Sequence, residues 1–301
     1  MLNATSFASV RRTVEEAVER AALPASFRAL LRIPLQQHGK ILTEEERPLW
    51  PTVVLAACTA TGGEPAFGAT VAAATELFMA GLDVLDEIED GDSSALVELA
   101  GPAQALNVST ALLLLGQQTL LGLVADGLPA AQVTLLTQTL TAAGLAATGG
   151  QHRDLANESD RIVSTDEALS IARSKAGTLV AGACRIGALL GTTDMDTLAL
   201  YETLGGHHGT AAQLANDLHG AENTLSKTDV ERQKGTLPLL YARGARAVAT
   251  GEPATIAASG ALHFTWVILE IERQRCVQLL DTLAARGHLV ADLRDLLGKV
   301  G

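Results

Sequence analysis

The sequence predicts an all-α protein, folded as a single-domain helical bundle over residues 1–301. Alanine and leucine are abundant, aromatic residues make up only 3% of the chain, and apolar residues recur at helical spacing over long stretches. Hydrophobic residues account for 48% of the composition, which is ample for a sizeable core. No Gly/Ser linker, charge run or fixed-period repeat divides the chain, so one domain is expected.

Proline and glycine divide the apolar pattern into about ten helices, followed by a short helix near the end of the chain. We expect the helices at residues 5–22, 25–37, 48–61, 66–90, 102–125, 129–147, 166–190, 195–225, 237–249 and 255–286, and the short one at 290–299. Helix 66–90 follows Gly62-Gly63-Glu64 and has Pro65 in its first turn, where proline is favoured.

Two of these helices, 102–125 and 129–147, are nearly free of charge and are long enough to be considered as a membrane hairpin. Several glutamine and threonine residues interrupt them, which is unfavourable in a lipid bilayer. We therefore expect these helices to be buried in the bundle or at a dimer face, with no stable membrane insertion.

The charge and cysteine content restrict the class of protein further. Acidic residues number 34 against 22 lysines and arginines, and the formal net charge of −12 makes nucleic-acid binding improbable. Cys58, Cys184 and Cys276 lie far apart in apolar helical context, which is typical of buried free thiols in a reducing compartment. The first twenty residues lack the basic start and apolar core of a signal peptide. A cytoplasmic protein is expected.

The end of helix 66–90 has an unusual charge, because six of the ten residues from Asp83 to Asp92 are acidic. A helix C-terminus carries partial negative charge, so each carboxylate there costs roughly 0.3–1 kcal/mol before mutual repulsion is counted. No lysine or arginine occurs between Arg47 and Arg153. We therefore expect a bound cation, and not a neighbouring side chain, to compensate this charge.

The spacing of the acids selects the candidate ligands. Asp83, Asp86 and Asp90 fall at i, i+3 and i+7 on one helical face, and Glu87 flanks them. Hard oxygen ligands at this spacing suit Mg²⁺ that is held jointly by carboxylates and substrate phosphates. Glu89 is expected to be a bystander. The alternative is a solvated acidic helix end without a metal.

Five segments of the chain, taken in order, match the sequence motifs of one enzyme family. The segments are Glu76-Leu77 with Asp86-Glu87-Ile88-Glu89-Asp90, Gly150-Gln151 with Asp154-Leu155, Lys175-Ala176-Gly177-Thr178-Leu179, Gln213-Leu214-Ala215-Asn216-Asp217, and Asp229 to Pro238 with Lys234 inside it. They resemble in turn the DDxxD, GQxxDL, KTxxL, FQxxDDxxD and DxxxxKxTLP motifs of the trans-isoprenyl diphosphate synthases, also called polyprenyl synthetases, and of the wider class I terpenoid synthases. The resemblance spans roughly residues 48–245.

The resemblance implies a helical bundle around a central cavity, Mg²⁺ as cofactor, an allylic isoprenoid diphosphate as substrate, and a homodimer. The implied catalytic residues are Asp86, Asp90, Lys175 and Lys234, and the implied diphosphate contacts are Lys175, Gln213 and Lys234. With Asp83 added on the helical-face argument alone, the expected metal ligands are Asp83, Asp86, Glu87, Asp90, Asn216 and Asp217. Gln213 and Asp217 share a helical face, so two antiparallel helices could direct carboxylates across one cavity.

Two departures from the family pattern decide the expected reaction. Members that elongate chains hold isopentenyl diphosphate with a GGKRLRP segment and with an Arg-Arg pair after the first aspartate motif. Here Lys40 and Arg47 are separated by three adjacent acids, and Gly91 to Ala95 contains no base. A second diphosphate would be poorly neutralised, so we expect a terpene synthase that ends in proton loss or water capture. A prenyltransferase using isopentenyl diphosphate or another acceptor, and a non-catalytic regulatory subunit of an active synthase, are the alternatives.

Overall fold

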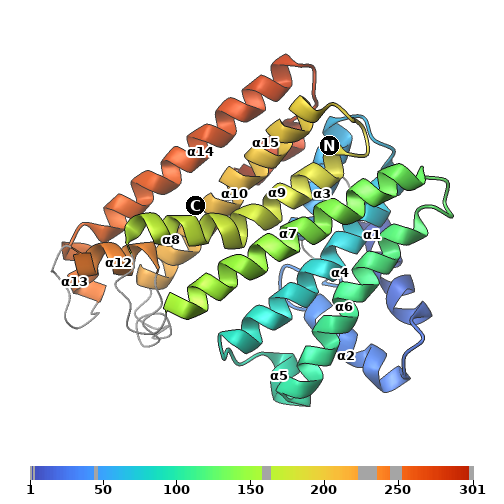
Figure 1. Ribbon diagram of the computed structural model, residues 1–301, viewed down its shortest axis with the longest axis horizontal. Coiled ribbons are helices and arrows are strands. Elements are labelled where there is room, and N and C mark those ends of the chain that lie inside the picture. The colour runs from blue at the N-terminus through green and yellow to red at the C-terminus, as the bar shows by residue number, and fades with distance from the viewer. Residues whose placement is uncertain are drawn as a thin grey trace. The chain divides into compact units, whose positions relative to one another are not determined.

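The computed structural model describes residues 2, 4–43, 47–157, 164–222, 236–244 and 253–297 (Figure 1). Throughout these residues the regular structure is helical, and no strand occurs among them. The predicted all-α class is therefore confirmed.

The chain divides into two compact units, each of which is described by itself. Unit 1 comprises Met1–Thr141, Ala183–Tyr201 and Gly287–Leu293, and unit 2 comprises Ala142–Gly182, Glu202–Arg286 and Arg294–Gly301. Several helices run from one unit into the other along the chain, so this division does not test the expectation of a single domain. That expectation stays a prediction.

Unit 1 is built around α4 (Pro65–Glu89), whose middle is buried on all sides. It packs against α6 (Pro102–Gly122), α3 (Leu49–Ala60) and α1 (Ala4–Arg20). The other helices that lie wholly in this unit are α2 (Ala25–Leu35) and α5 (Ala95–Ala100). A Cβ atom on Gly116 would lie 2.8 Å from the carbonyl oxygen of Ala74, so glycine allows α6 to approach the backbone of α4.

Among the described residues, α4 is the one helix that is long and apolar enough to cross a membrane by length and composition. Within its most apolar window, 78% of the residues are buried inside the protein. Burial of that extent is what a central core helix shows, and it explains why α4 carries almost no charge before its last turns.

Unit 2 contains one long helical path in three parts, α8 (Thr165–Ala172), a π-helical turn η1 (Arg173–Gly177) and α9 (Thr178–Ala188), of which α9 continues into unit 1. The π turn and the beginning of α9 pack against α10 (Met195–Glu222). The remaining helices of this unit are α12 (Leu237–Gly244), α13 (Pro253–Ala258) and α14 (Ala261–Ala285). In Figure 1, α14 lies alongside α10.

The helix boundaries agree closely with the expected ones, and the differences have physical causes. Helix α7 (Ala130–Asn157) continues well past the expected end at residue 147, through Gly149 and Gly150, because nothing there ends the backbone hydrogen bonding. The segment 255–286 is two helices instead of one, since Gly260 adopts a left-handed conformation with φ of 80°. The short helix α15 (Ala291–Leu297) lies where a terminal helix was expected, whereas the short helix α5 was not expected.

The three cysteines agree with the prediction made for them. Cys58, Cys184 and Cys276 are all free and buried. Burial raises the pKa of the Cys58 thiol to about 11 and, with the charge of Glu272 adding to it, the pKa of Cys276 to about 12. The thiols of Cys58 and Cys276 therefore act as apolar core groups and not as nucleophiles.

One acidic side chain lies inside the core of unit 1. Glu76 on α4 is fully buried, and its Oε1 accepts a hydrogen bond of 2.9 Å from the backbone amide of Ile41. Its Oε2 has no hydrogen-bond partner. Burial raises the pKa of Glu76 to about 7, although the positive charge of Lys40 and the Ile41 amide act in the opposite direction. Glu76 thus fixes the loop before α3 to the centre of the unit.

This burial predicts a pH-dependent stability. Folding raises the pKa of Glu76 from 4.5 to about 7. The contribution of Glu76 to the free energy of unfolding is therefore fully present below pH 4.5 and is lost as the pH rises through 7. Glu76→Gln mimics the protonated form at every pH. From pH 4.5 to pH 8, the difference in free energy of unfolding between the variant and the wild type should therefore increase by about 3 kcal/mol in favour of the variant. Urea unfolding without divalent cations measures this. The exposed Glu89 with the same substitution is the control, and wild-type and Glu76→Gln curves that stay parallel would contradict the prediction.

Candidate functional site

The acidic segment lies where the sequence places it, at the end of α4. Asp83, Asp86 and Glu87 belong to the last turns of the helix, and Asp90 is the residue that caps it. All four side chains are partly exposed. The acidic segment is therefore partly open to solvent.

The expectation that no base compensates these acids is wrong. The Nζ atom of Lys40 forms an ion pair with Oδ2 of Asp83, although 43 residues separate the two in the chain. Burial by itself would lower the pKa of Lys40, but the charges of Asp83 and Glu76 raise it above its ordinary value. Lys40 therefore stays charged, and Asp83 is already neutralised by a side chain. The sequence did not indicate this ion pair, because Lys40 and Asp83 lie far apart along the chain.

The loop that carries Lys40 is held in place by a second base. Arg11 donates from Nε to the carbonyl oxygen of Ile41 at 3.0 Å and from a terminal nitrogen to that of Thr43 at 2.9 Å. With the Glu76 contact to the Ile41 amide, the loop is anchored on both sides. Lys40 is therefore presented to the acidic segment by a fixed backbone.

The remaining acids have the chemistry that Mg²⁺ prefers. Glu87 accepts a hydrogen bond from Gln37 at 3.4 Å through Oε1, and its Oε2 is buried without a hydrogen-bond partner. Within the part of the chain that the structure describes, no group of three or more His, Cys, Asp or Glu side chains is arranged to hold a metal by itself. The unpartnered oxygen of Glu87 and the acids next to it fit Mg²⁺, which is commonly bound through one or two carboxylates together with substrate phosphates.

A polar cleft lies within unit 2. Its lining residues are Asp154, Ala168, Ile171, Ala172, Lys175, Gln213, Asn216, Asp217, Thr236 and Leu237. The Nζ atom of Lys175 lies 3.4 Å from Oδ2 of Asp154, and Gln213 donates a hydrogen bond of 2.9 Å to Oδ1 of Asp217. Asp217 is only 8% exposed. The cleft thus combines one ammonium group with two carboxylates and two side-chain amides.

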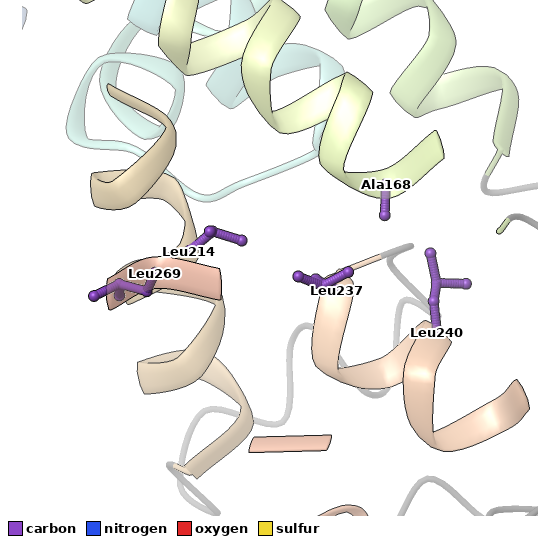
Figure 2. Close-up of a cluster of buried hydrophobic side chains, with 5 residues drawn as sticks. All are labelled: Ala168, Leu214, Leu237, Leu240 and Leu269. Atoms are coloured by element: carbon purple, nitrogen blue, oxygen red, sulfur yellow. The ribbon is translucent and has the colours of Figure 1, made fainter. Parts of the chain in front are cut away.

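An apolar cluster lies beside these polar groups. Figure 2 shows its buried members, which come from α8, α10, α12 and α14 and are Ala168, Leu214, Leu237, Leu240 and Leu269. Ala168 and Leu237 also line the cleft, so one part of its wall is apolar. None of the ten lining residues is aromatic. The cleft is therefore amphipathic, with a charged part and an aliphatic part.

The structure brings together four of the residues that the sequence singled out. Lys175 comes from the π turn, and Gln213, Asn216 and Asp217 come from successive turns of α10. Lys234 lies outside the described residues. The motif pair Gly150-Gln151 and Asp154-Leu155 was noticed in the sequence without a role for Asp154, whose contact with Lys175 the structure supplies.

Comparison with known proteins identifies the family. The family model described as polyprenyl synthetase matches residues 32–256. The geranylgeranyl diphosphate synthase of Mycobacterium tuberculosis is 28% identical over 215 residues, which cover 68% of this chain and 60% of that protein. The tryptophan prenyltransferase ComQ of Bacillus subtilis is 26% identical over 246 residues, covering 74% of this chain and 78% of that protein.

Solved structures show the same fold. A polyprenyl synthetase from Streptomyces coelicolor matches with a TM-score of 0.77 at 24% identity, covering 92% of each chain. A geranylgeranyl pyrophosphate synthase matches with a TM-score of 0.82 at 18% identity, covering the whole of both chains. The family match, the order of the motifs and the helical fold agree, and the chain belongs to the polyprenyl synthetase family.

Proposed function

We propose that this chain is a Mg²⁺-dependent prenyltransferase that ionises an allylic isoprenoid diphosphate and joins the isoprenyl group to isopentenyl diphosphate. The observation that carries the proposal is the cleft of unit 2, where Lys175 lies among Gln213, Asn216 and Asp217 beside an aliphatic wall. Curated relatives named as geranylgeranyl and farnesyl diphosphate synthases support it. The expected terpene synthase has no such support, so the prenyltransferase alternative replaces it.

In the proposed reaction, Lys175 stabilises the diphosphate as the bond between carbon and oxygen breaks. Its ammonium group is a point charge for phosphate oxygens, and charge that is fixed in advance lowers the barrier most where negative charge develops. Gln213 orients Asp217 through their hydrogen bond. Lys234 is proposed as a second diphosphate contact on its motif alone. The aliphatic wall at Ala168 and Leu237 would exclude water from the isoprenyl chain.

Mg²⁺ would neutralise diphosphate charge when bound. We propose Asp86, Glu87 and Asp90 of unit 1 as the residues that hold it at one position, and Asn216 and Asp217 of unit 2 as the residues that hold it at a separate, second position. We leave Asp83 out of this set, because Lys40 already forms an ion pair with its carboxylate.

The first test measures diphosphate release with Mg²⁺ and C10, C15 or C20 allylic diphosphates. Asp86→Asn should lower kcat by about 100-fold or more, because a metal ligand is lost. Lys175→Gln should lower kcat/KM by about 10–150-fold, as expected for the loss of a hydrogen bond to a charged group. Glu89→Gln changes an exposed acid of the same segment and should behave as wild type. Absence of release from the wild-type chain with every substrate would leave the regulatory-subunit alternative.

A second candidate is transfer to an acceptor without a diphosphate, and the ion pair between Lys40 and Asp83 favours it. In this pair the lysine charge is already neutralised, and Glu76 and Glu87 lie near it. A second diphosphate would have to separate Lys40 from Asp83 in a negative environment. The name of ComQ, a tryptophan prenyltransferase, shows that a family relative uses an acceptor of this kind.

The two acceptors are separated by adding isopentenyl diphosphate to the same assay. The main proposal predicts products longer by five carbons only when isopentenyl diphosphate is present. Asp83→Asn frees Lys40, so at saturating Mg²⁺ it should lower the KM for isopentenyl diphosphate by about 2–5-fold. Diphosphate release without any elongated product, in wild type and Asp83→Asn alike, would reject the main proposal in favour of the second candidate.

We also propose a homodimer formed through α6 and the first part of α7. Leu106, Leu114, Leu121 and Leu135 on these helices are 45%, 64%, 58% and 45% exposed. A hydrogen bond of 2.9 Å from Gln117 to Thr141 joins the two helices. Exposed leucines gathered on neighbouring helices favour association with a second copy.

Sedimentation velocity should give about twice the chain mass of 31.2 kDa for the wild type at micromolar concentration. Leu114→Glu should shift the protein towards the single-chain mass, because a charge would be buried at the interface. Leu99→Glu introduces the same charge at the exposed helix α5 and should leave the dimer intact. A wild-type protein that sediments as a single chain would contradict the proposal.

We place the protein in the cytoplasm. The support is that all three cysteines are free and buried, as is usual for proteins of a reducing compartment.

A further inference from the structure

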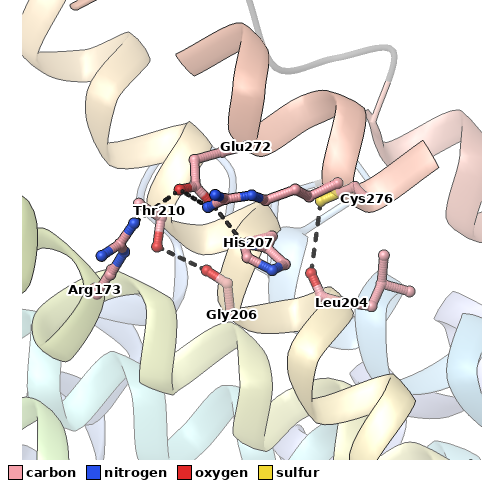
Figure 3. A network of polar contacts seen from close by, with 8 residues as sticks. Arg173, Leu204, Gly206, His207, Thr210, Glu272 and Cys276 are labelled. Carbon is pink, nitrogen blue, oxygen red and sulfur yellow. Dashed lines mark hydrogen bonds and ion pairs between the residues drawn. The ribbon is translucent and has the colours of Figure 1, made fainter. Parts of the chain in front are cut away.

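A buried carboxylate in unit 2 lies outside the cleft and has no role in the proposed reaction. The side chain of Glu272 on α14 is 1% exposed, and three bases surround it (Figure 3). Its Oε1 accepts hydrogen bonds from Arg173 at 3.1 Å and from Arg275 at 2.9 Å, and its Oε2 contacts Nδ1 of His207. The carboxylate therefore joins three helical segments: the π turn, α10 and α14.

Packing alone does not explain this cluster. Burial of a carboxylate is costly, and an apolar residue of similar size is often as stable or more stable at such a position. Burial by itself would raise the pKa of Glu272, but the hydrogen bonds from His207 and Arg173 outweigh it and the pKa is lowered. The side chain is thus held ionised between its partners. An ionised group kept in the interior indicates a need for directed contacts.

The partner Arg173 belongs to the same π turn as Lys175. This turn comprises Arg173–Gly177, a conformation that is rare and often occurs at functional sites. Arg173 extends towards Glu272, whereas Lys175, two residues later, lines the cleft. The orientation of the turn therefore determines where the ammonium group of Lys175 lies.

The turn is also packed closely against its neighbours. A Cβ atom on Gly150 of α7 would lie 2.9 Å from the backbone nitrogen of Lys175, and one on Gly209 of α10 would lie 2.5 Å from the carbonyl oxygen of Ala176. Arg153 of α7 contacts the hydroxyl groups of Ser170, at 3.4 Å, and Ser174. Glycine contacts bring the backbones together, but they do not prevent one helix from rotating or sliding along another. Hydrogen bonds between charged side chains have a fixed direction and restrict such movement.

We propose that Glu272 is a positioning residue for diphosphate binding. By holding Arg173 of the π turn and His207 of α10 together, it fixes the relation between the two segments that supply the cleft. Lys175 from the turn and Gln213 from α10 then contact one diphosphate, and Asp217 beside them would hold the Mg²⁺ that neutralises its charge. Glu272 itself touches neither substrate nor cleft. This inference rests on the proposed function, because it assigns diphosphate binding to the cleft.

The test is calorimetric titration of the full chain with inorganic diphosphate in the presence of Mg²⁺, which needs no turnover. Glu272→Gln should weaken binding by about tenfold, and Arg173→Gln should weaken it by a similar factor. The double variant should show little further loss, since both changes break the same contact. Glu270→Gln, two residues away on α14, changes an acid that accepts a 2.7 Å hydrogen bond from Gln274 and should bind as wild type.

Steady-state kinetics gives an independent measure of positioning. The KM of Glu272→Gln for the allylic diphosphate should rise by about tenfold. The melting temperature of Arg173→Gln should stay near the wild-type value, because the Arg173 side chain is half exposed. If Glu272→Gln folds poorly, Arg173→Gln still tests the contact from its exposed side.

Three outcomes are distinguishable with Lys175→Gln as the reference. If Lys175→Gln loses diphosphate affinity while Glu272→Gln and Arg173→Gln retain it, the positioning role is rejected and the proposed function stands. If the losses of the two single variants multiply in the double variant, the two residues act independently and the positioning role is also rejected. If Lys175→Gln binds as wild type, the lysine does not contact diphosphate, and both the proposed function of the cleft and the positioning role fall.

Discussion

The close approach of the π turn to α10 is the contact on which the cleft of unit 2 depends. Gly177 and Gly209 lie where the two backbones meet, and a Cβ atom at Gly177 would lie 3.0 Å from the hydroxyl oxygen of Thr210. A Cβ atom at Gly209 would lie only 2.5 Å from the carbonyl oxygen of Ala176, a distance that the backbones could accommodate only by moving apart. Lys175 comes from one side of this contact and Asp217 from the other, so the chemistry follows from the packing.

Ion pairs between the few bases and buried or partly buried acids are a second recurring feature of the structure. A chain with a net charge of −12 has few bases, and the structure uses several of them in partly or fully buried pairs. Lys40 neutralises Asp83 at the end of α4, and two arginines with one histidine hold Glu272. Glu272 keeps two of its three basic neighbours when Arg173 alone is substituted, so the buried carboxylate stays compensated.

Most of the fold could be predicted from the sequence, because apolar periodicity and Pro or Gly punctuation are local signals. Helix α4 and its first proline are examples. What the sequence could not predict depends on contacts between distant segments. The left-handed turn at Gly260 and the π turn at Arg173 interrupt apparently continuous helical patterns. Lys40 meets Asp83 only because the folded chain brings together residues 43 positions apart, which no periodicity in the sequence indicates.

The candidate site likewise contains residues that the sequence predicts and residues that only the structure shows. Lys175, Gln213, Asn216 and Asp217 could be found because they occur in motifs, and the structure brings them to one cleft. Glu272 belongs to no motif and looks like any helical acid in the sequence. Its single unusual property, almost complete burial among bases, appears only in three dimensions.

The central claim is that the cleft around Lys175 binds the substrate diphosphate. A crystal structure with Mg²⁺ and a non-reactive allylic diphosphate analogue tests it most directly. We predict phosphate oxygens within hydrogen-bond distance of the Nζ atom of Lys175, with the isoprenyl chain against Ala168 and Leu237. An analogue bound elsewhere, with no phosphate oxygen in contact with Lys175, would contradict the account.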